Sequence, residues 1–264
     1  MLKKRIIPKI TFSSIEFGLA NRLAAVTTRK FKKKRVIGNP VSLARIYEKS
    51  GADQLLIINK DRLNISNNPL ILELIKNVAN EIAMPVCFGG GISSLDDCAK
   101  LFYSGIDKIS INLAAVNNPK LITEITKTFG SQALTICIDY WAENNTGDMK
   151  YPNTYETASK NIILNWVKKC QDLGAGEINL SCVSKDGSKT GLDYEFAAEV
   201  RTCLEVPLLI SGGCDSWEHF AKAFKEIDVD GVIASTFFVE TDQNMVELKN
   251  KLIVNSVPIR GIFS

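Results

Sequence analysis

The segment Gly174–Gly187, GAGEINLSCVSKDG, has the pattern of a buried β-strand followed by a polar turn. Its apolar run from Ile178 to Val183 predicts the strand, and the following Ser184–Gly187 predicts the turn. A related segment, GADQLLIIN, occupies Gly51–Asn59, 123 residues earlier in the chain. Self-similarity at a fixed spacing indicates a fold built from repeated units.

Further segments recur at nearly the same spacing and in the same order. MPVCFGGGIS (Met84–Ser93) corresponds to VPLLISGGCD (Val206–Asp215), and GIDKISIN (Gly105–Asn112) corresponds to VDGVIAS (Val229–Ser235). The segment RIIPKIT (Arg5–Thr11) has a weaker counterpart in ALTICID (Ala133–Asp139). Four strands, each followed by a helical run, therefore occur twice. We predict the α/β class: a (β/α)8 TIM barrel, one domain over residues 1–264, made of two pseudo-symmetric half-barrels at about 1–127 and 128–264.

Length and composition agree with one large barrel and exclude several other classes. The chain has 264 residues, a hydrophobic content of 45% and a formal net charge of +3, which is too weak to indicate a nucleic-acid partner. It contains no long apolar run and no signal-peptide pattern, so we expect a cytoplasmic protein without a membrane partner. The seven cysteines are scattered and form no C-x-x-C pair, so we expect neither disulfides nor a structural zinc, and no cofactor.

The predicted elements follow from apolar runs and helix-boundary residues. We expect strands at Lys3–Ile10, Gln54–Asn59, Val86–Phe88, Lys108–Asn112, Leu134–Asp139, Ile178–Val183, Leu208–Ser211 and Gly231–Ala234. We expect helices to begin at Pro40, Pro69, Ser94, Asn118-Pro119, about Ile162, Tyr194, Trp217 and Gln243.

Two long connections are expected at the mouth of the barrel. The first, Thr11–Asn39, contains TTRKFKKKR (Thr27–Arg35), with six basic residues in nine. It is either a solvated loop or an anion-binding lid, because βα-loops lie at the active-site face of a barrel. The second, Trp141–Thr157, is polar and long, and we expect it over the same face.

Glycines follow two of the predicted strands at corresponding positions. Gly89–Gly91 follow the third strand and Gly212-Gly213 follow the seventh, while Asn112 and Ser235 end the fourth and eighth. Glycines at such positions let backbone N–H groups approach an anion closely. Two such sites on opposite sides of the mouth predict a substrate that carries two phosphates.

Two carboxylates are expected between these sites. Asp139 ends the fifth strand and Asp186 lies in the turn after the sixth. A carboxylate at a strand's carboxyl end is a candidate general acid or base. The residue that corresponds to Asp139 on the first strand is Thr11, which cannot exchange a proton at neutral pH. Half of a two-carboxylate pair is therefore missing.

The motifs RIIP, FGGGI, DKISINLAAV-x-NP, FGSQ, CID, GAGEI, KDG-x-x-x-G-x-D and SGG resemble the cyclase subunit of imidazole glycerol phosphate synthase, the HisF family. The resemblance runs from Arg5 to about Leu252, and FGSQ at Phe129–Gln132 is its most specific motif. It implies a lyase or synthase subunit that receives ammonia from a HisH-like glutaminase at the bottom of the barrel. The ammonia is combined with a phosphorylated ribulosyl aminoimidazole nucleotide.

The resemblance assigns phosphate-binding roles to six positions and exposes one difference. Those positions are Gly91, Asn112, Gly187, Gly213, Ala234 and Ser235. The residue after Asn112 is normally Thr in the family and is Leu113 here, so one hydroxyl donor is absent.

The catalytic positions depart further from the family. Of its two catalytic aspartates, one matches Asp139 and the other falls on Thr11. Asp186 matches another active-site carboxylate, but its usual companion two residues earlier is Ser184. The aspartate that normally ends the second strand is Asn59. The catalytic lysine of the loop after the first strand has no clear counterpart in Ser13–Asn21.

The bottom of the barrel keeps more of the family pattern. The ring of ammonia-gate residues falls on Arg5, Gln54, Lys108 and Glu177, so three of the four positions keep a charge. Asp107 matches a position that contacts the glutaminase.

Three functions remain open. The first is a HisF paralogue that still receives ammonia but has altered cyclase chemistry, as in relatives that pair with a sugar amidotransferase and support acetamidino modification of surface polysaccharide such as lipopolysaccharide. The second is a working cyclase of histidine biosynthesis. The third is a non-catalytic scaffold that only conducts ammonia.

Overall fold

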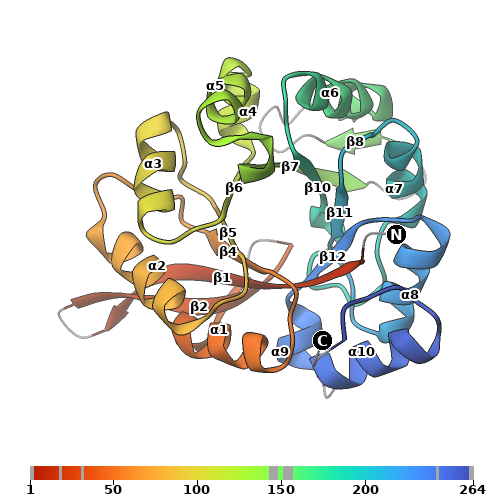
Figure 1. Cartoon of the computed structure of the whole chain (residues 1–264), viewed down its shortest axis with the longest axis horizontal. Helices are drawn as coiled ribbons and strands as arrows, with labels where there is room; N and C mark the ends of the chain where they lie inside the picture. Colours follow the sequence, from red (N-terminus) through yellow and green to blue (C-terminus); the bar gives the residue numbers. More distant parts are fainter. Residues whose placement is uncertain are drawn as a thin grey trace.

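The eight strands of the barrel form a closed ring in a computed structural model of the chain (Figure 1). The structure describes residues 3–17, 20–30, 33–142, 148–150, 157–241 and 244–261. Neighbouring strands are parallel throughout the ring, and β7 pairs with β10 to close it. The ring consists of β1 (Arg5–Phe17), β4 (Leu55–Asn59), β5 (Val86–Gly89), β6 (Lys108–Ile111), β7 (Leu134–Ala142), β10 (Glu177–Cys182), β11 (Leu208–Ser211) and β12 (Gly231–Ala234). The predicted (β/α)8 barrel is confirmed; its origin as two half-barrels stays a prediction.

Helices cover the outside of the ring (Figure 1). They are α1 (Pro40–Lys49), α2 (Pro69–Glu81), α3 (Leu95–Tyr103), α4 (Leu113–Asn117), α5 (Lys120–Phe129), α6 (Lys160–Asp172), α7 (Tyr194–Arg201), α8 (Trp217–Glu226), α9 (Thr236–Glu240) and α10 (Met245–Val254). Their boundaries follow local chemistry. At α3, for example, Ser94 and Asp97 exchange side-chain and backbone hydrogen bonds as a capping box.

The first predicted loop is wrong. β1 continues past Ile10 to Phe17 and pairs with β2 (Ala20–Arg29), which pairs with β3 (Lys33–Gly38), so Thr11–Asn39 is largely a three-stranded antiparallel sheet. The density of basic residues suggested a loop. The short apolar segment Ala24–Val26 is buried, however, and holds the sheet against the barrel.

Two further departures concern the connections. The short helices α4 and α9 follow β6 and β12 directly and were not expected, because five residues carry too little periodicity to be recognised. In the second long connection, β7 continues to Ala142. The short strand β8 (Asp148–Lys150) pairs with β7, and β9 (Thr157–Ser159) pairs with β8. Residues 143–147 and 151–156 of that prediction lie outside the described residues.

Two apolar regions hold the barrel together. The larger lies between the strands and the surrounding helices. The smaller lies inside the ring, where it comprises Ile7, Leu56, Cys87, Leu209 and Ile233 from five different strands. The interior of the barrel is therefore packed on the side of β1, β4, β5, β11 and β12.

A buried ion pair joins α10 to the beginning of the ring. Lys249 on α10 is fully buried, and its Nζ lies 2.8 Å from Oδ1 of Asp53, directly ahead of β4. The other oxygen of Asp53 accepts a hydrogen bond from the Ile6 backbone N–H at 2.8 Å. In the described part of the chain, no helix is both long and apolar enough to cross a membrane.

Candidate functional site

The four predicted gate residues meet in one hydrogen-bonded network at the amino ends of the barrel strands. Arg5 donates to Glu177 Oε2 at 2.5 Å and to Gln54 Oε1 at 3.0 Å. The Lys108 ammonium lies 3.3 Å from both oxygens of Glu177. Glu177 is only 2% exposed, and Arg5 and Lys108 surround it with positive charge. The structure thus brings together all four residues, and two cations neutralise the buried carboxylate.

Thr135 is a fifth residue of this network and was not predicted from the sequence. Its hydroxyl donates to Glu177 Oε1 at 2.8 Å, within the buried interior. Thr135 lies two and four residues before Cys137 and Asp139 on β7, so all three side chains point to the same side of the strand. That alternation is the signal that could have identified it.

Polar side chains continue from the gate to the mouth along two neighbouring strands. The register of β7 and β10 pairs Glu177 with Thr135, Asn179 with Cys137, and Ser181 with Asp139. We call these three pairs the polar ladder. Within it, the Asn179 amide donates to Cys137 Sγ at 3.4 Å, and Cys137 Sγ lies 3.5 Å from Asp139 Oδ1. The apolar residues of β1, β4, β5, β11 and β12 line the rest of the interior, and one of them, Leu209, lies beside Asn179 in the register of β10 and β11.

The upper end of the polar ladder opens into a cavity of about 400 Å³ at the carboxyl ends of the strands. Asp139 lines this cavity, and Oδ2 of its carboxylate accepts a 2.8 Å hydrogen bond from the Asn112 amide. Burial raises the pKa of Asp139, and hydrogen bonds from Ser181 and Cys137 offset this only in part. A carboxyl group that holds its proton at higher pH than usual is suited to proton transfer.

Asp186, the second predicted carboxylate, is bound from two directions. Its Oδ1 lies 3.3 Å from the Lys9 ammonium, and its Oδ2 accepts from the Thr28 hydroxyl at 3.1 Å. The Lys30 backbone N–H donates to the Asp186 carbonyl at 3.1 Å. Asp186 therefore fastens the end of β2 across the mouth of the barrel, between β1 and the turn after β10.

The other changed positions have structural roles. Thr11 is 8% exposed and lines the cavity. Asn59 is 1% exposed, and its amide donates to the carbonyls of Leu63 and Gly90. Ser184 accepts a hydrogen bond from the Ala142 N–H at 3.2 Å. Among these three, an amide and two hydroxyls stand where the resemblance implies carboxylates, so none can act as a general base near neutral pH.

The predicted first phosphate site coincides with a second cavity, of about 360 Å³. Gly90, Gly91, Ser93, Asn112 and Leu113 line it. Gly91 has a φ of +81°, and a Cβ there would lie 2.4 Å from the Leu63 carbonyl oxygen, so no larger residue fits.

Asn112 and Arg62 modify this first site. The Asn112 side chain is turned toward Asp139, and its buried Oδ1 has no hydrogen-bond partner among the described residues. An unpaired buried acceptor of this kind suits a donor from a ligand. Arg62 also lines this cavity, next to Leu113, where the family's hydroxyl is absent.

The predicted second phosphate site lies at the ends of β10, β11 and β12. Ala234 ends β12, and Ser235 precedes α9 directly. Gly213 approaches the Gly191 backbone so closely that a Cβ would lie 2.4 Å from its carbonyl oxygen. A Cβ at Gly187 would likewise lie 2.8 Å from the Thr28 carbonyl oxygen. The close backbone approach required at both glycines is present, and their role in phosphate binding stays a prediction.

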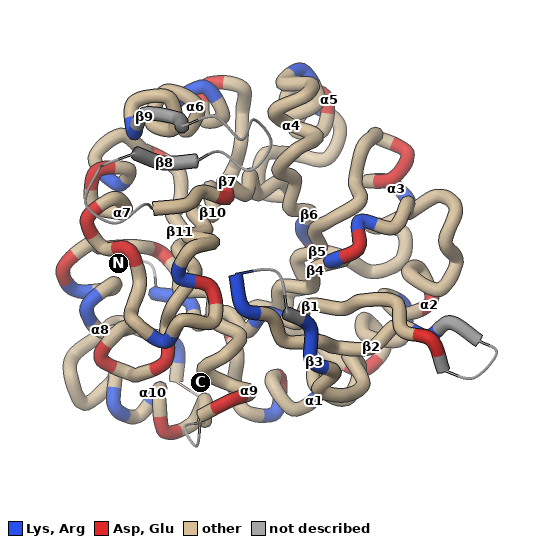
Figure 2. Tube along the Cα trace, turned by 180° about the vertical axis from the view of Figure 1, so that it is seen from behind, with Lys and Arg blue, Asp and Glu red and all other residues tan. Residues whose placement is uncertain are grey.

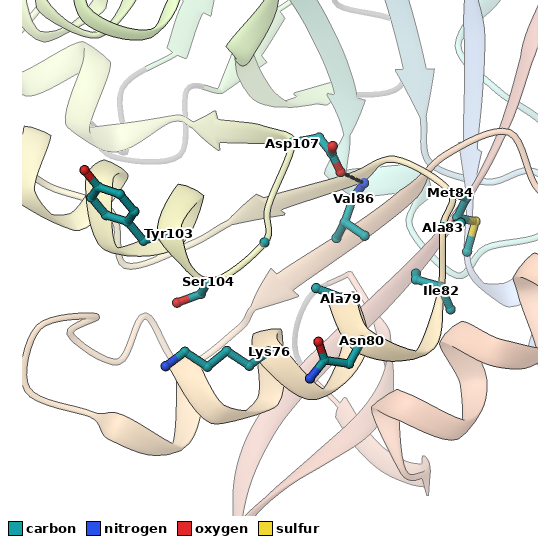
Figure 3. A pocket seen from close by; sticks show the side chains of 11 residues that line it. Lys76, Ala79, Asn80, Ile82, Ala83, Met84, Val86, Tyr103, Ser104 and Asp107 are labelled. Carbon is teal, nitrogen blue, oxygen red and sulfur yellow. Dashed lines mark hydrogen bonds between the residues drawn. The ribbon is translucent and has the colours of Figure 1, made fainter.

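Asp107, the predicted partner contact, lies beside a groove at the amino ends of the strands, between α2 and α3 (Figure 3). Its Oδ2 accepts a hydrogen bond from the Val86 N–H at 2.8 Å. Asp53 and Asp230 make the same kind of bond to Ile6 and Leu208. Asp107 therefore contributes to strand alignment whether or not a partner also contacts it.

Basic residues border the central opening of the ring. Figure 2 shows such segments in the β2–β3 hairpin and in the stretch after β4. Lys34 of the hairpin pairs with Asp61 at 2.5 Å, and Arg35 pairs with Glu240 at 3.0 Å. These two cations of the predicted lid thus bind carboxylates of the chain itself, and residues 31–32 of that segment lie outside the described part.

Comparison with known proteins identifies relatives along nearly the whole chain. The profile of the family described as "Histidine biosynthesis protein" matches residues 18–244. The chain is 39% identical to "Imidazole glycerol phosphate synthase subunit HisF" of Buchnera aphidicola over 270 residues, which cover 98% of this chain and 99% of that one. It is 36% identical over 260 residues, with coverage of 98% and 99%, to a Prochlorococcus marinus protein whose name includes "imidazole glycerol phosphate synthase subunit hisF2". The HisF subunit of Lactococcus lactis is 35% identical over 264 residues, with coverage of 99% and 98%.

Proposed function

Because the chain belongs to the HisF family of imidazole glycerol phosphate synthase subunits, we propose that it receives ammonia from a HisH-like glutaminase and supports an amidotransfer reaction with altered cyclase chemistry. The observation that carries this proposal is the network of the four gate positions at one end of the barrel, three of which keep their charge, combined with three missing carboxylates at the other. We propose that the transfer serves acetamidino-sugar formation in surface polysaccharide, together with a sugar amidotransferase in the cytoplasm.

The gate supports delivery of ammonia. Arg5, Lys108 and Glu177 form a compact ionic plug at the amino ends of the strands, where the family's glutaminase binds. Gln54 replaces one charge of the family ring and binds Arg5 as a neutral acceptor. A glutaminase that displaces one of these side chains would open the barrel interior to ammonia.

The polar ladder supports a definite route from the gate to the mouth. Ammonia is small, polar and hydrogen-bonding, and an apolar wall offers it no partner. Thr135, Asn179 and Ser181 provide hydroxyl and amide groups on one side of the interior, whereas Ile7 and Leu56 belong to the apolar group of β1 and β4. We propose that ammonia moves along β7 and β10 and reaches the substrate at Asp139.

The mouth supports altered chemistry. Asp139 retains the position and the raised pKa of a proton-transfer group. Its expected partner at position 11 is a threonine, and Asn59 uses its amide as a donor, which a carboxylate cannot do. Loss of a general acid or base typically slows a reaction by about 10²–10⁴-fold. The cyclase reaction therefore lacks groups on which it depends.

The decisive experiment assays the purified chain with an ammonium salt and the family's phosphoribulosyl aminoimidazole substrate. We expect no formation of imidazole glycerol phosphate, and partial activity in the Thr11→Asp variant. Turnover by the unchanged chain at the rate of an ordinary HisF subunit would overturn the proposal and establish a working cyclase, the alternative that the retained Asp139 favours.

A non-catalytic scaffold is distinguished by its sensitivity to substitution. In the complex with glutaminase and amidotransferase, Asp139→Asn would leave product formation unchanged if the chain only conducts ammonia. Lys108→Met would abolish glutamine-dependent formation in either case. We expect both variants to lower product formation, because we place chemistry at Asp139 as well as passage at the gate.

A further inference from the structure

Three cations meet at the central cavity of the mouth, at positions to which the family resemblance assigns no role. Lys9 comes from β1, while Lys60 and Arg62 come from the turn after β4, and all three line the same 400 Å³ cavity. The Lys9 side chain is only 15% exposed, so it lies inside the barrel rather than on its rim. Asp139 is the carboxylate among the described residues that line this cavity.

The mouth carries fewer carboxylates than the family pattern implies. The resemblance expects aspartates at positions 11, 59 and 184, and this chain has Thr11, Asn59 and Ser184 there. Carboxylates are thus lost from the mouth where cations line it. With three cations and one carboxylate among its described lining residues, this cavity attracts negative charge.

Lys60 and Arg62 are also close enough for the charge of Arg62 to affect the pKa of Lys60. Burial lowers the pKa of Lys60, and the positive charges of Lys34 and Arg62 lower it further, against the opposing effect of Asp61 and Asp186. An anion placed among these groups would relieve that repulsion. Such a ligand would be stabilised by ammonium and guanidinium donors at once.

The ion pair between Lys9 and Asp186 is compatible with a further contact from Lys9 to an anion in the cavity. Lys9 lies 3.3 Å from Asp186, yet an ammonium group carries three donors and can serve a second acceptor. Arg62 lines both the central cavity and the cavity of the first predicted phosphate site. It can therefore bind an oxyanion at their junction, next to the position where Leu113 lacks a hydroxyl.

We propose that Lys9, Lys60 and Arg62 form a third anion subsite, which binds a carboxylate or phosphate carried between the two phosphate ends of the substrate. This inference names the substrate class of the mouth, and so it rests on the proposed function. A substrate of this class is a phosphorylated sugar or sugar acid with three anionic groups. The family's aminoimidazole nucleotide has phosphates at its ends but no third anion between them.

Two pairs of probes test the proposal, and the members of each pair differ by one anionic group. Isothermal titration calorimetry compares 2-carboxyarabinitol 1,5-bisphosphate with arabinitol 1,5-bisphosphate, and inositol 1,4,5-trisphosphate with inositol 1,4-bisphosphate. We expect the full chain to bind the three-anion member of at least one pair about 10–100-fold more tightly, as charge-assisted hydrogen bonds allow. The pair that shows the preference identifies the third anion as carboxylate or phosphate.

Matched variants localise the effect. Lys60→Met and Arg62→Met should remove most of the preference within the better pair, and Lys9→Met should do the same if circular dichroism shows that it folds. The control is Lys127→Met, which removes the same charge from an exposed position on α5 and should keep the preference. Equal affinity within both pairs, absence of binding by all four probes, or an equal loss in Lys127→Met would overturn the proposal.

The outcome is independent of ammonia delivery. The titration contains no glutaminase, ammonium or aminoimidazole compound, so a failure of the third subsite leaves the cyclase assay and the gate untouched. Turnover in the cyclase assay, in turn, would overturn the proposed function without changing the measured ratio of probe affinities.

Discussion

The Asn59 amide donates a 3.3 Å hydrogen bond to the Gly90 carbonyl, and so binds the turn after β4 to the glycine run after β5. The same amide donates to the Leu63 carbonyl at 2.9 Å, while its oxygen accepts from the Leu63 N–H. A carboxylate at this position could accept from the Leu63 N–H but could donate to neither carbonyl. The change from the family's aspartate at this position is therefore part of the local structure around the predicted first phosphate site.

Asn59→Asp should destabilise the protein rather than restore cyclase activity. The new carboxylate cannot donate to Leu63 or Gly90, and each buried carbonyl left without a donor costs about 1–3 kcal/mol. Urea denaturation should show a lower midpoint, with no activity in the ammonium-dependent cyclase assay. Asn68→Asp is the control, because Asn68 caps α2 as an acceptor and a carboxylate is favourable there. Unchanged stability of Asn59→Asp would contradict this account.

Glu177→Gln should weaken the gate and the fold together. It leaves Arg5 and Lys108 facing each other without the buried carboxylate that joins them. Removal of one partner of a buried ion pair typically costs about 3–5 kcal/mol, and the partial exposure of both cations places the expected loss at the lower end. The free energy of unfolding is measured by urea titration. Glu73→Gln on the exposed face of α2 removes the same charge and should have little effect.

Asn179→Leu should interrupt the polar ladder while it preserves the volume of the side chain. The variant removes the amide beside Cys137 and extends the apolar wall across the interior. We expect glutamine-dependent product formation in the complex to fall roughly tenfold, the equivalent of one lost hydrogen bond, with ammonium-dependent formation unchanged. Leu209→Met, beside Asn179 on the neighbouring strand β11, is the volume-matched control. An equal fall in both reactions would place the defect at the mouth instead of along the route.

Asp139→Asn should stabilise the fold and abolish proton transfer. Burial raises the pKa of Asp139 in the folded state, so the native protein binds this proton more tightly than the unfolded chain. Its contribution to stability is therefore present at low pH and is lost as the pH rises through the folded-state pKa. The variant should melt at a higher temperature than the unchanged chain at neutral pH and show no gain at pH 3. A lower melting temperature at pH 7 would contradict the raised pKa.

The barrel could be predicted because the signals of each strand and helix are local in sequence and recur in the same order at one spacing. The strand Gly231–Ala234 has the predicted boundaries, and the helix Pro69–Glu81 begins at the predicted residue, where Asn68 caps it and proline opens it. The β1–β2–β3 sheet was missed because its evidence lies in the pairing of strands. Thr11 lies opposite Val26, and Val26 lies opposite Val36. The basic, polar composition of this segment does not indicate which residues pair.

The site was predictable only where a residue keeps the family's chemistry. The gate was found through Arg5, Lys108 and Glu177, whose charges stand out at strand starts. Lys9 and Lys60 were not singled out, because only the closed ring shows that they line one cavity. For Lys9 a signal did exist: Arg5 and Thr11 were already assigned to the interior, and Lys9 lies on the same side of β1 by alternation.

The pair of Lys249 and Asp53 also sets an order of events during synthesis. Asp53 fixes the Ile6 N–H at the start of β1, yet its counter-ion lies nearly 200 residues later, on α10. While the ribosome is still producing the second half of the chain, this aspartate has no cation to neutralise it as it enters the interior. We therefore expect the contact between α10 and the start of β1 to form last. A nascent chain stalled before α10 should remain sensitive to protease at β1 even when β4, β5 and β6 have already paired.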